Sequence, residues 1–182
     1  LGIPASQITV IPMEIGGGFG GKLSAYLEPL AAVLSKKSGF PVKMTMSRSE
    51  VLEATGPTSG SYQKITLGYD SKGKINGAKA IMLLEAGAFP GSPVSGAASA
   101  IFSPYNIENV HIDGYDIVTN KPKTTAYRAP GSPIAMFAVE SMMNEIAEIV
   151  NLDPVELRIL NAAKKGTRRA DGVINGTIGA ID

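Results

Sequence analysis

The chain has 182 residues, of which 44% are hydrophobic and 18% are charged, enough to bury an ordinary core in one or two domains. Its net charge of +1 provides no basic field for nucleic acid, and its apolar runs are too short to span a membrane. The sequence contains no cysteine, so it can supply neither a disulfide nor thiolate ligands for zinc or an iron–sulfur cluster.

The N-terminal part of the sequence predicts both strands and helices. Residues 7–14 are rich in Ile and Val, which favours a strand. Residues 22–37 are apolar almost all round, which predicts a buried helix, and Pro29 is expected to kink it. A short strand over residues 42–46 and one helical turn over residues 49–54 are expected to follow.

The middle of the sequence predicts a β-hairpin. Residues 62–69 and 74–85 alternate between apolar and polar side chains and are separated by the turn sequence 70–73. Imperfect alternation in the returning strand indicates a bulge or a change of register. Residues 87–104 consist largely of Gly, Ala, Ser and Pro, a composition typical of a flexible loop. Residues 109–119 predict another strand, whose His111 is expected to lie on the surface.

The C-terminal part predicts two helices. Ser132 is a candidate N-cap for a long helix, with Pro133 at its first position. Residues 153–156 read as a capping box that begins a final helix ending at Leu160. These elements together predict an α+β domain, with strands and helices segregated. The predicted apolar stripe of the long helix consists of Ile134, Phe137, Ala138, Met142, Ile146 and Ile149.

The glycine loop, residues 15–22, contains the sequence GGGFGGK and follows the first predicted strand. It satisfies the dinucleotide fingerprint G-x-G-x-x-G, but residues 35–42 contain no carboxylate to bind a ribose. It also satisfies G-x-x-x-x-G-K, but Leu23 stands where a phosphate-binding loop needs Ser or Thr. A turn that merely allows close helix–strand packing is a further interpretation. The loop by itself therefore leaves these alternatives open.

A second segment, which we call the arginine loop (residues 125–132), contains the run Ala-Tyr-Arg-Ala-Pro-Gly at 126–131. Together with GGGFGGK, it resembles the paired signature of the molybdenum hydroxylases, the family of xanthine dehydrogenase and aldehyde oxidase. The resemblance covers nearly the whole chain, including residues 43–50, 105–110, 137–150, 152–158 and Asn161. It implies an α+β fold of the molybdenum-cofactor-binding type. It also implies that residues 87–104 form a packed segment close to the substrate pocket, partly as a short helix, instead of a flexible loop. Residues 1–182 would form a partial molybdopterin-binding domain of a larger chain, with its C-terminal helices at 133–162.

The resemblance implies that both loops line a molybdenum–pterin cofactor. Phe19 and Arg128 would lie near molybdenum, without any direct protein ligand to the metal. A core role for Phe19 and a structural role for Arg128 are the alternatives, and Lys22 is expected to bond backbone or solvent. The implied cofactor-binding residues are Gly17, Gly18, Phe19, Gly20, Gly21, Ala126, Tyr127, Arg128 and Ala129.

The resemblance also narrows the implied reaction. Leu23 and Pro130 stand where purine-oxidising members have glutamate and phenylalanine, and Ala129 stands where carbon monoxide dehydrogenases have cysteine. Purine and carbon monoxide are therefore disfavoured, leaving hydroxylation or reduction of an aldehyde, an aromatic heterocycle or an aryl thioester. The general-base glutamate is expected beyond residue 182, so no catalytic residue is assigned within the chain. We expect an inactive piece of a longer protein, because the sequence also begins with Leu1 rather than Met.

The implied cofactor is molybdopterin with molybdenum, in its cytosine dinucleotide form. The 2Fe-2S clusters and FAD would belong to partner domains or subunits of a cytoplasmic enzyme. Its partners would be the remaining domains of the same large subunit and a small-molecule substrate, with no nucleic acid and no membrane. A nucleotide-binding domain that uses the glycine loop and a non-catalytic scaffold domain of the same fold remain as alternatives.

Overall fold

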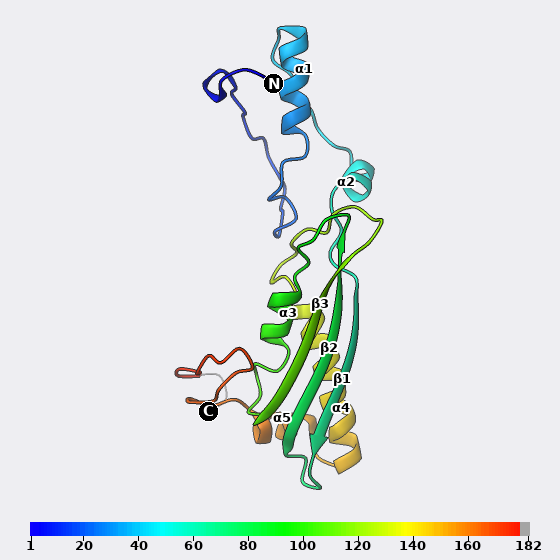
Figure 1. Ribbon diagram of the computed structural model, residues 1–182, viewed down its shortest axis with the longest axis vertical. Coiled ribbons are helices and arrows are strands. Elements are labelled where there is room, and N and C mark those ends of the chain that lie inside the picture. The colour runs from blue at the N-terminus through cyan, green and yellow to red at the C-terminus, as the bar shows by residue number, and fades with distance from the viewer. Residues whose placement is uncertain (179–182) are drawn as a thin grey trace. The chain divides into compact units, whose positions relative to one another are not determined.

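The computed structural model describes residues 1–178 and divides the chain into two compact units (Figure 1). The first unit comprises Leu1–Thr58 and Thr125–Arg128, and the second comprises Ser59–Thr124 and Ala129–Asp182. The last residues of the predicted domain, 179–182, lie outside the described residues. The described residues combine helices with a mixed sheet, which confirms the α+β class that the sequence predicts.

The first unit contains one 3₁₀ turn, η1 (Ala5–Gln7), and two helices, α1 (Glu28–Ser38) and α2 (Arg48–Ala54). The predicted strands over residues 7–14 and 42–46 are wrong, because both segments are irregular. A strand needs a partner for its backbone groups, and no strand of the described residues pairs with either segment.

The predicted helix over residues 22–37 begins later and is more exposed than expected. Pro29 lies in the first turn of α1 and does not kink the helix. The N–H groups of the first turn have no intrahelical acceptor, so a proline, which has no N–H, is tolerated there. No residue of α1 is buried, and Leu30 is 53% exposed. The helical turn predicted over residues 49–54 is confirmed as α2, which begins with a capping box between Ser47 and Glu50.

The second unit is built on a three-stranded mixed sheet in the order β1-β2-β3. β1 (Ser61–Tyr69) and β2 (Ile75–Gly87) form the predicted antiparallel hairpin, and β3 (Asn109–Val118) runs parallel to β2. The register shifts between Gly68 and Tyr69, which confirms the expected irregularity. The turn is closed by Asp70, whose Oδ1 accepts hydrogen bonds from the N–H groups of Lys72 and Lys74.

Three helices complete the second unit: α3 (Val94–Ala100), α4 (Ser132–Val150) and α5 (Pro154–Asn161). Figure 1 shows α4 behind the sheet. The buried residues of α4 and alternate residues of β2 belong to the same hydrophobic core. The short helix α3 lies in the Gly/Ala/Ser/Pro-rich segment, which is therefore not one flexible loop. The fully buried core side chains include Ala80, Met82, Leu84, Ile101, Val139, Met143 and Leu157.

Two predictions about α4 are wrong. The N-cap is Gly131 rather than Ser132, with φ at +89°. A Cβ at Gly131 would lie 2.5 Å from the Pro93 carbonyl oxygen, so only glycine fits against that backbone. The buried stripe is also rotated from the predicted one, because Phe137 is 78% exposed while its neighbours on the opposite face are covered. The buried residues of α4 are Ala135, Val139, Met143, Ile146 and Ala147.

The predicted start of α5 is confirmed, since the Asp153 side chain accepts hydrogen bonds from the N–H groups of Val155 and Glu156. Polar contacts then join α5 to α4. The Arg158 Nε donates to Glu140 at 2.7 Å, and the Tyr105 hydroxyl donates to the same carboxylate. Burial and the hydrogen bond to Glu140 raise the pKa of Tyr105 well above its ordinary value, so the phenol stays protonated.

The surface position predicted for His111 is confirmed, because its side chain is exposed and pairs with Asp113 at 3.0 Å. None of the helices within residues 1–178 is both long enough and apolar enough to cross a bilayer.

Replacing Asn161 with leucine is expected to lower the free energy of unfolding by about 3 kcal/mol. The Asn161 side chain is fully buried, accepts a hydrogen bond from the Ile75 N–H, and donates to the carbonyl oxygens of Gly73 and Leu157, each at 2.9 Å. Leucine would leave these buried backbone groups without partners. Urea denaturation would measure the loss, and the exposed Asn120→Leu variant is the control. Equal stability of the two variants would contradict the prediction.

Candidate functional site

The glycine loop has a backbone that most side chains could not adopt. Gly16, Gly17 and Gly20 have φ values of +69°, +111° and +95°, in the left-handed region that favours glycine. Phe19 also has a positive φ, +50°, which is strained for an aromatic residue. The loop closes on itself through a hydrogen bond from the Gly21 N–H to the Gly18 carbonyl at 2.8 Å.

The glycine loop and the first half of the arginine loop meet within the first unit. The Arg128 N–H donates to the Phe19 carbonyl at 2.7 Å. A Cβ at Gly20 would lie 3.2 Å from both the Cβ and the carbonyl oxygen of Ala126, which is tighter than ordinary packing. The tertiary structure thus brings together two segments that lie far apart in the sequence, and glycine is required where their backbones approach.

The side chains of these loops point largely into open space. Phe19 is 63% exposed, and Tyr127, Arg128 and Leu23 are exposed as well. The Lys22 ammonium donates to the Ile15 carbonyl, which agrees with the backbone role expected for it. Ala129 belongs to the second unit, where its φ of +54° and a hydrogen bond from the Ser132 N–H form the turn before α4.

Residues that sequence analysis did not single out connect both loops to the segment at 56–57. The Thr125 hydroxyl donates to the Gly56 carbonyl at 2.8 Å, and the Thr125 N–H donates to the Pro57 carbonyl at 2.9 Å. The Tyr26 hydroxyl lies 3.4 Å from the Gly21 carbonyl and accepts from the Gly56 N–H at the same distance. The sequence predicts that Tyr26 lies within a buried helix, and the hydrophobic pattern there does not indicate that its hydroxyl connects Gly21 and Gly56.

Replacing Thr125 with valine is expected to loosen the arginine loop. Valine keeps the shape of the side chain but loses the hydrogen bond to Gly56, a net loss of about 1 kcal/mol. The Arg128 N–H bonded to Phe19 should then exchange with solvent about fivefold faster, as amide hydrogen exchange would measure. Thr66→Val, on the exposed face of β1, is the control. Unchanged exchange at Arg128 in Thr125→Val would show that Thr125 does not support the loop.

Comparison with known proteins identifies the family to which this chain is similar. Residues 1–162 match the family described as "Molybdopterin cofactor-binding domain". The nicotinate dehydrogenase large molybdopterin subunit of Eubacterium barkeri is 31% identical over 186 residues, covering 100% of this chain and 44% of the relative. The xanthine dehydrogenase molybdenum-binding subunit of Escherichia coli O157:H7 is 35% identical over 170 residues, covering 91% of this chain and 23% of the relative.

A solved structure agrees with these relatives. The aldehyde oxidoreductase of Desulfovibrio gigas superposes with a TM-score of 0.83 at 28% identity, covering 91% of this chain and 19% of that protein. The chain spans less than half the length of the curated relatives it matches. The match over residues 1–162, which includes both loops, shows that the chain belongs to the molybdopterin cofactor-binding domain family.

Proposed function

We propose that this chain is a cofactor-lining domain of a molybdenum–pterin oxidoreductase, the molybdenum hydroxylase class to which its named relatives belong. The single observation that carries the proposal is the junction of the two loops, where the Arg128 N–H bonds the Phe19 carbonyl. This junction joins the backbones of both halves of the family signature, and the side chains of Phe19 and Arg128 are each exposed. The whole protein would oxidise or reduce a small molecule.

The backbone of the glycine loop fits an anionic cofactor. Among residues 1–178, the N–H groups of Gly17, Gly18, Phe19 and Gly20 have no hydrogen-bond acceptor. Consecutive N–H groups without acceptors in a glycine-rich turn form a concave donor surface for anions. The cofactor-binding residues that we propose are Gly17, Gly18, Phe19, Gly20, Gly21, Ala126, Tyr127, Arg128 and Ala129.

When bound, the molybdenum–pterin group supplies the redox centre at which a substrate carbon is hydroxylated or reduced. Phe19, an exposed ring on a rigid turn, would exclude water from that centre and so strengthen electrostatic interactions near it. The Arg128 guanidinium, with its several N–H donors, would stabilise negative charge that develops there. Neither side chain is proposed as a metal ligand.

The proposed substrate is an aldehyde, an aromatic heterocycle or an aryl thioester. Leu23, Ala129 and Pro130 replace the residues that the family resemblance associates with purine or carbon monoxide chemistry. The similarity to a protein named nicotinate dehydrogenase supports the aromatic heterocycle among these classes. Leu23 is 82% exposed beside the glycine loop, so it would offer such a ring an apolar contact.

The rest of the protein would complete the site. None of the residues of the first unit is fully buried, and apolar side chains such as Ile11 and Phe40 are more than 70% exposed. We infer that further domains of the same large subunit cover this surface and supply the general-base glutamate. We further propose that the cofactor is in its cytosine dinucleotide form and that the enzyme is cytoplasmic. The 2Fe-2S clusters and FAD would lie on partner domains or subunits.

Molybdenum content tests the proposal. The full-length protein would be produced in a host that makes the pterin cofactor, and its molybdenum-to-protein ratio measured by mass spectrometry. We expect about one molybdenum per chain in the wild type, and loss of metal or activity in Phe19→Glu and Arg128→Ala. Phe137→Glu, at an exposed position of α4 in the second unit, and Arg48→Ala introduce the same changes outside both loops and should retain both. A folded wild-type protein without molybdenum would contradict the proposal and favour the nucleotide-binding or scaffold alternative.

A further inference from the structure

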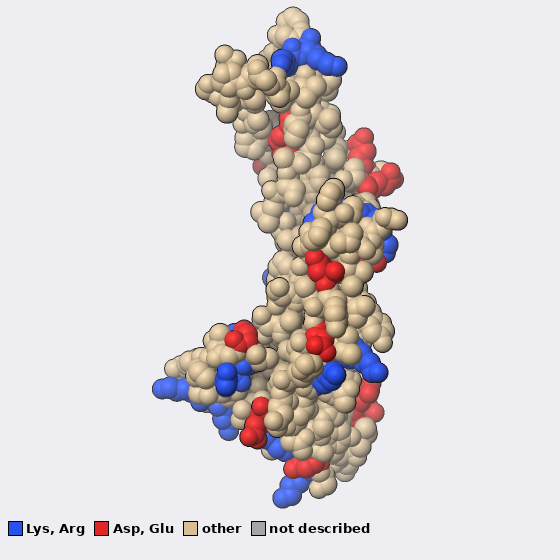
Figure 2. Space-filling view, viewed as in Figure 1, with Lys and Arg blue, Asp and Glu red and all other residues tan. Residues whose placement is uncertain are grey.

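A strongly basic hairpin follows α5 in the second unit. Residues 164–175 fold back on themselves through hydrogen bonds from the Gly166 N–H to the Asn175 carbonyl and from the Asn175 N–H to the Thr167 carbonyl, both at 2.9 Å. Figure 2 shows Lys and Arg side chains gathered in this part of the molecule, at the lower left. The hairpin contains four cationic residues, Lys164, Lys165, Arg168 and Arg169, and one acidic residue, Asp171.

The base of this hairpin is fixed to the core. The Ala163 N–H donates to the Pro104 carbonyl at 2.7 Å, and Tyr105 and Ala162 form an antiparallel bridge. The Thr167 side chain is buried and accepts a hydrogen bond from the Lys164 N–H at 2.9 Å. The cations therefore project from an ordered backbone, so their charges are held together at one position.

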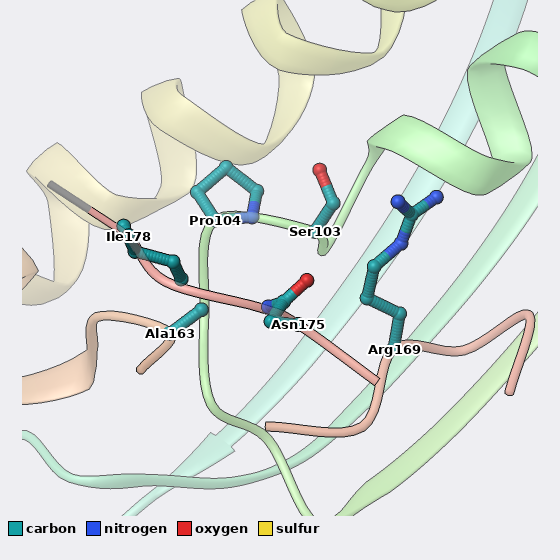
Figure 3. Close-up of a pocket in the computed structure, with 6 residues that line it drawn as sticks. All are labelled: Ser103, Pro104, Ala163, Arg169, Asn175 and Ile178. Carbon is teal, nitrogen blue, oxygen red and sulfur yellow. The ribbon is translucent and has the colours of Figure 1, made fainter. Parts of the chain in front are cut away.

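A pocket of about 310 Å³ opens between the hairpin and the residues before Tyr105. Figure 3 shows that Arg169 and Asn175 from the hairpin and Ser103 from the opposite wall supply its polar groups. The remaining walls, formed by Pro104, Ala163 and Ile178, are apolar. This volume lies at the lower end of the range for small-molecule sites, and the combination of apolar walls with a few polar groups is typical of them.

Arg169 retains unused hydrogen-bonding capacity at this pocket. Its Nη2 donates to Asp171 at 2.6 Å, but its buried Nε has no hydrogen-bond partner among the described residues. A buried charged donor without an acceptor is costly, so an acceptor from outside the described residues is expected to reach this guanidinium. A phosphoryl group is the anion that best matches a guanidinium donor surrounded by further cations.

We infer that this hairpin and pocket bind a small phosphate-bearing ligand, with its phosphoryl group on Arg169 and its apolar body against Pro104 and Ala163. Lys164, Lys165 and Arg168 are exposed and contribute the surrounding positive field. The inference is independent of molybdenum. It assigns to this domain a second ligand site, separate from the two loops of the first unit.

Isothermal titration of the cofactor-loaded full-length protein with phenyl phosphate tests this site, and inorganic phosphate and benzoate are compared at equal ionic strength. Phenyl phosphate should bind most tightly, because inorganic phosphate lacks the apolar body and benzoate carries a singly charged carboxylate in place of the phosphoryl group. Arg169→Gln should weaken its binding about tenfold or more. Lys72→Gln, in the exposed β1–β2 turn, removes the same charge elsewhere and should leave binding unchanged.

Asp171→Asn provides a test of opposite sign. The amide can still accept the hydrogen bond that Asp171 receives from the Val173 N–H at 3.1 Å, so the turn is preserved. Removing the carboxylate releases Arg169 Nη2, and phenyl phosphate should bind severalfold more tightly. Weaker binding in this variant, equal losses in Arg169→Gln and Lys72→Gln, or binding no tighter than that of benzoate would overturn the inference. Binding only to cofactor-free protein would also overturn it, because the phosphate recognised would then be that of the pterin.

Discussion

Gly87→Ala is expected to destabilise the second unit by about 4 kcal/mol, the largest effect of any single substitution that we predict for stability. Gly87 ends β2 with φ at +76°, and a Cβ there would lie 2.1 Å from the Pro122 carbonyl oxygen and 2.8 Å from the Lys123 Cα. Both obstacles are backbone atoms, so no side chain can rotate away. The strand end and the segment at 122–123 would have to separate, and urea denaturation followed by circular dichroism would record the loss.

Two further glycines distinguish the two causes of the expected loss of stability in Gly87→Ala, which are backbone strain and the clash with Pro122. Gly166 has a similar φ of +88° with open space around it, so Gly166→Ala should cost only the conformational strain, about 1 kcal/mol. Gly77 lies inside β2 with an ordinary φ, and its nearest atom would be 3.9 Å from an added Cβ. Gly77→Ala should therefore be close to neutral. If Gly87→Ala cost no more than Gly166→Ala, the close approach to Pro122 would be refuted.

Gly20→Ala is expected to lower the turnover of the full-length enzyme about tenfold or more, because a small displacement of catalytic groups is enough for that loss. The added Cβ would lie 3.2 Å from the Ala126 Cβ and carbonyl oxygen, and the positive φ of Gly20 adds strain. The two loops would move apart and lengthen the hydrogen bond between Phe19 and Arg128. Steady-state kinetics and the molybdenum-to-protein ratio would both be measured.

Gly16→Ala is the matched control for this loop. Gly16 has a φ of +69°, and an added Cβ would meet nothing within 4 Å. Gly16→Ala therefore introduces the backbone strain of a positive φ, as Gly20→Ala does, but no contact with the other loop. Ala126→Gly combined with Gly20→Ala should recover part of the lost turnover, since it removes one of the two obstructing atoms. Equal turnover in Gly16→Ala and Gly20→Ala would mean that contact between the loops is not what glycine provides.

Local chemistry made several elements predictable from sequence. Asp153 before Pro154 specified the start of α5, because an Asp side chain satisfies N–H groups that would otherwise lack partners at a helix start. The turn at Asp70 and the alternation on either side of it specified the β-hairpin. In each case the residues that determine the element lie close together in the sequence, so the element can be predicted without knowing any distant contact.

Burial in the helices could not be read in the same way. The apolar residues of α1 are exposed, and those of α4 face the core along a different stripe from the predicted one. Both helices are apolar on more than one face, so hydrophobic periodicity alone does not choose the face that is covered. That choice depends on which surface β2 and α3 present to α4.

The sequence by itself determined the α+β class, the hairpin, the start of α5 at its capping residue, and the two loop motifs that resemble the molybdenum hydroxylases. Only the tertiary structure decided that the Phe19 carbonyl meets the Arg128 N–H, that Thr125 and Tyr26 connect these loops to Gly56, and that Arg169 faces a pocket. The physical reason is the range of the interactions. Caps, turns and left-handed glycines are set by neighbouring backbone groups, whereas a contact between residues 19 and 128 exists only once the whole chain has folded.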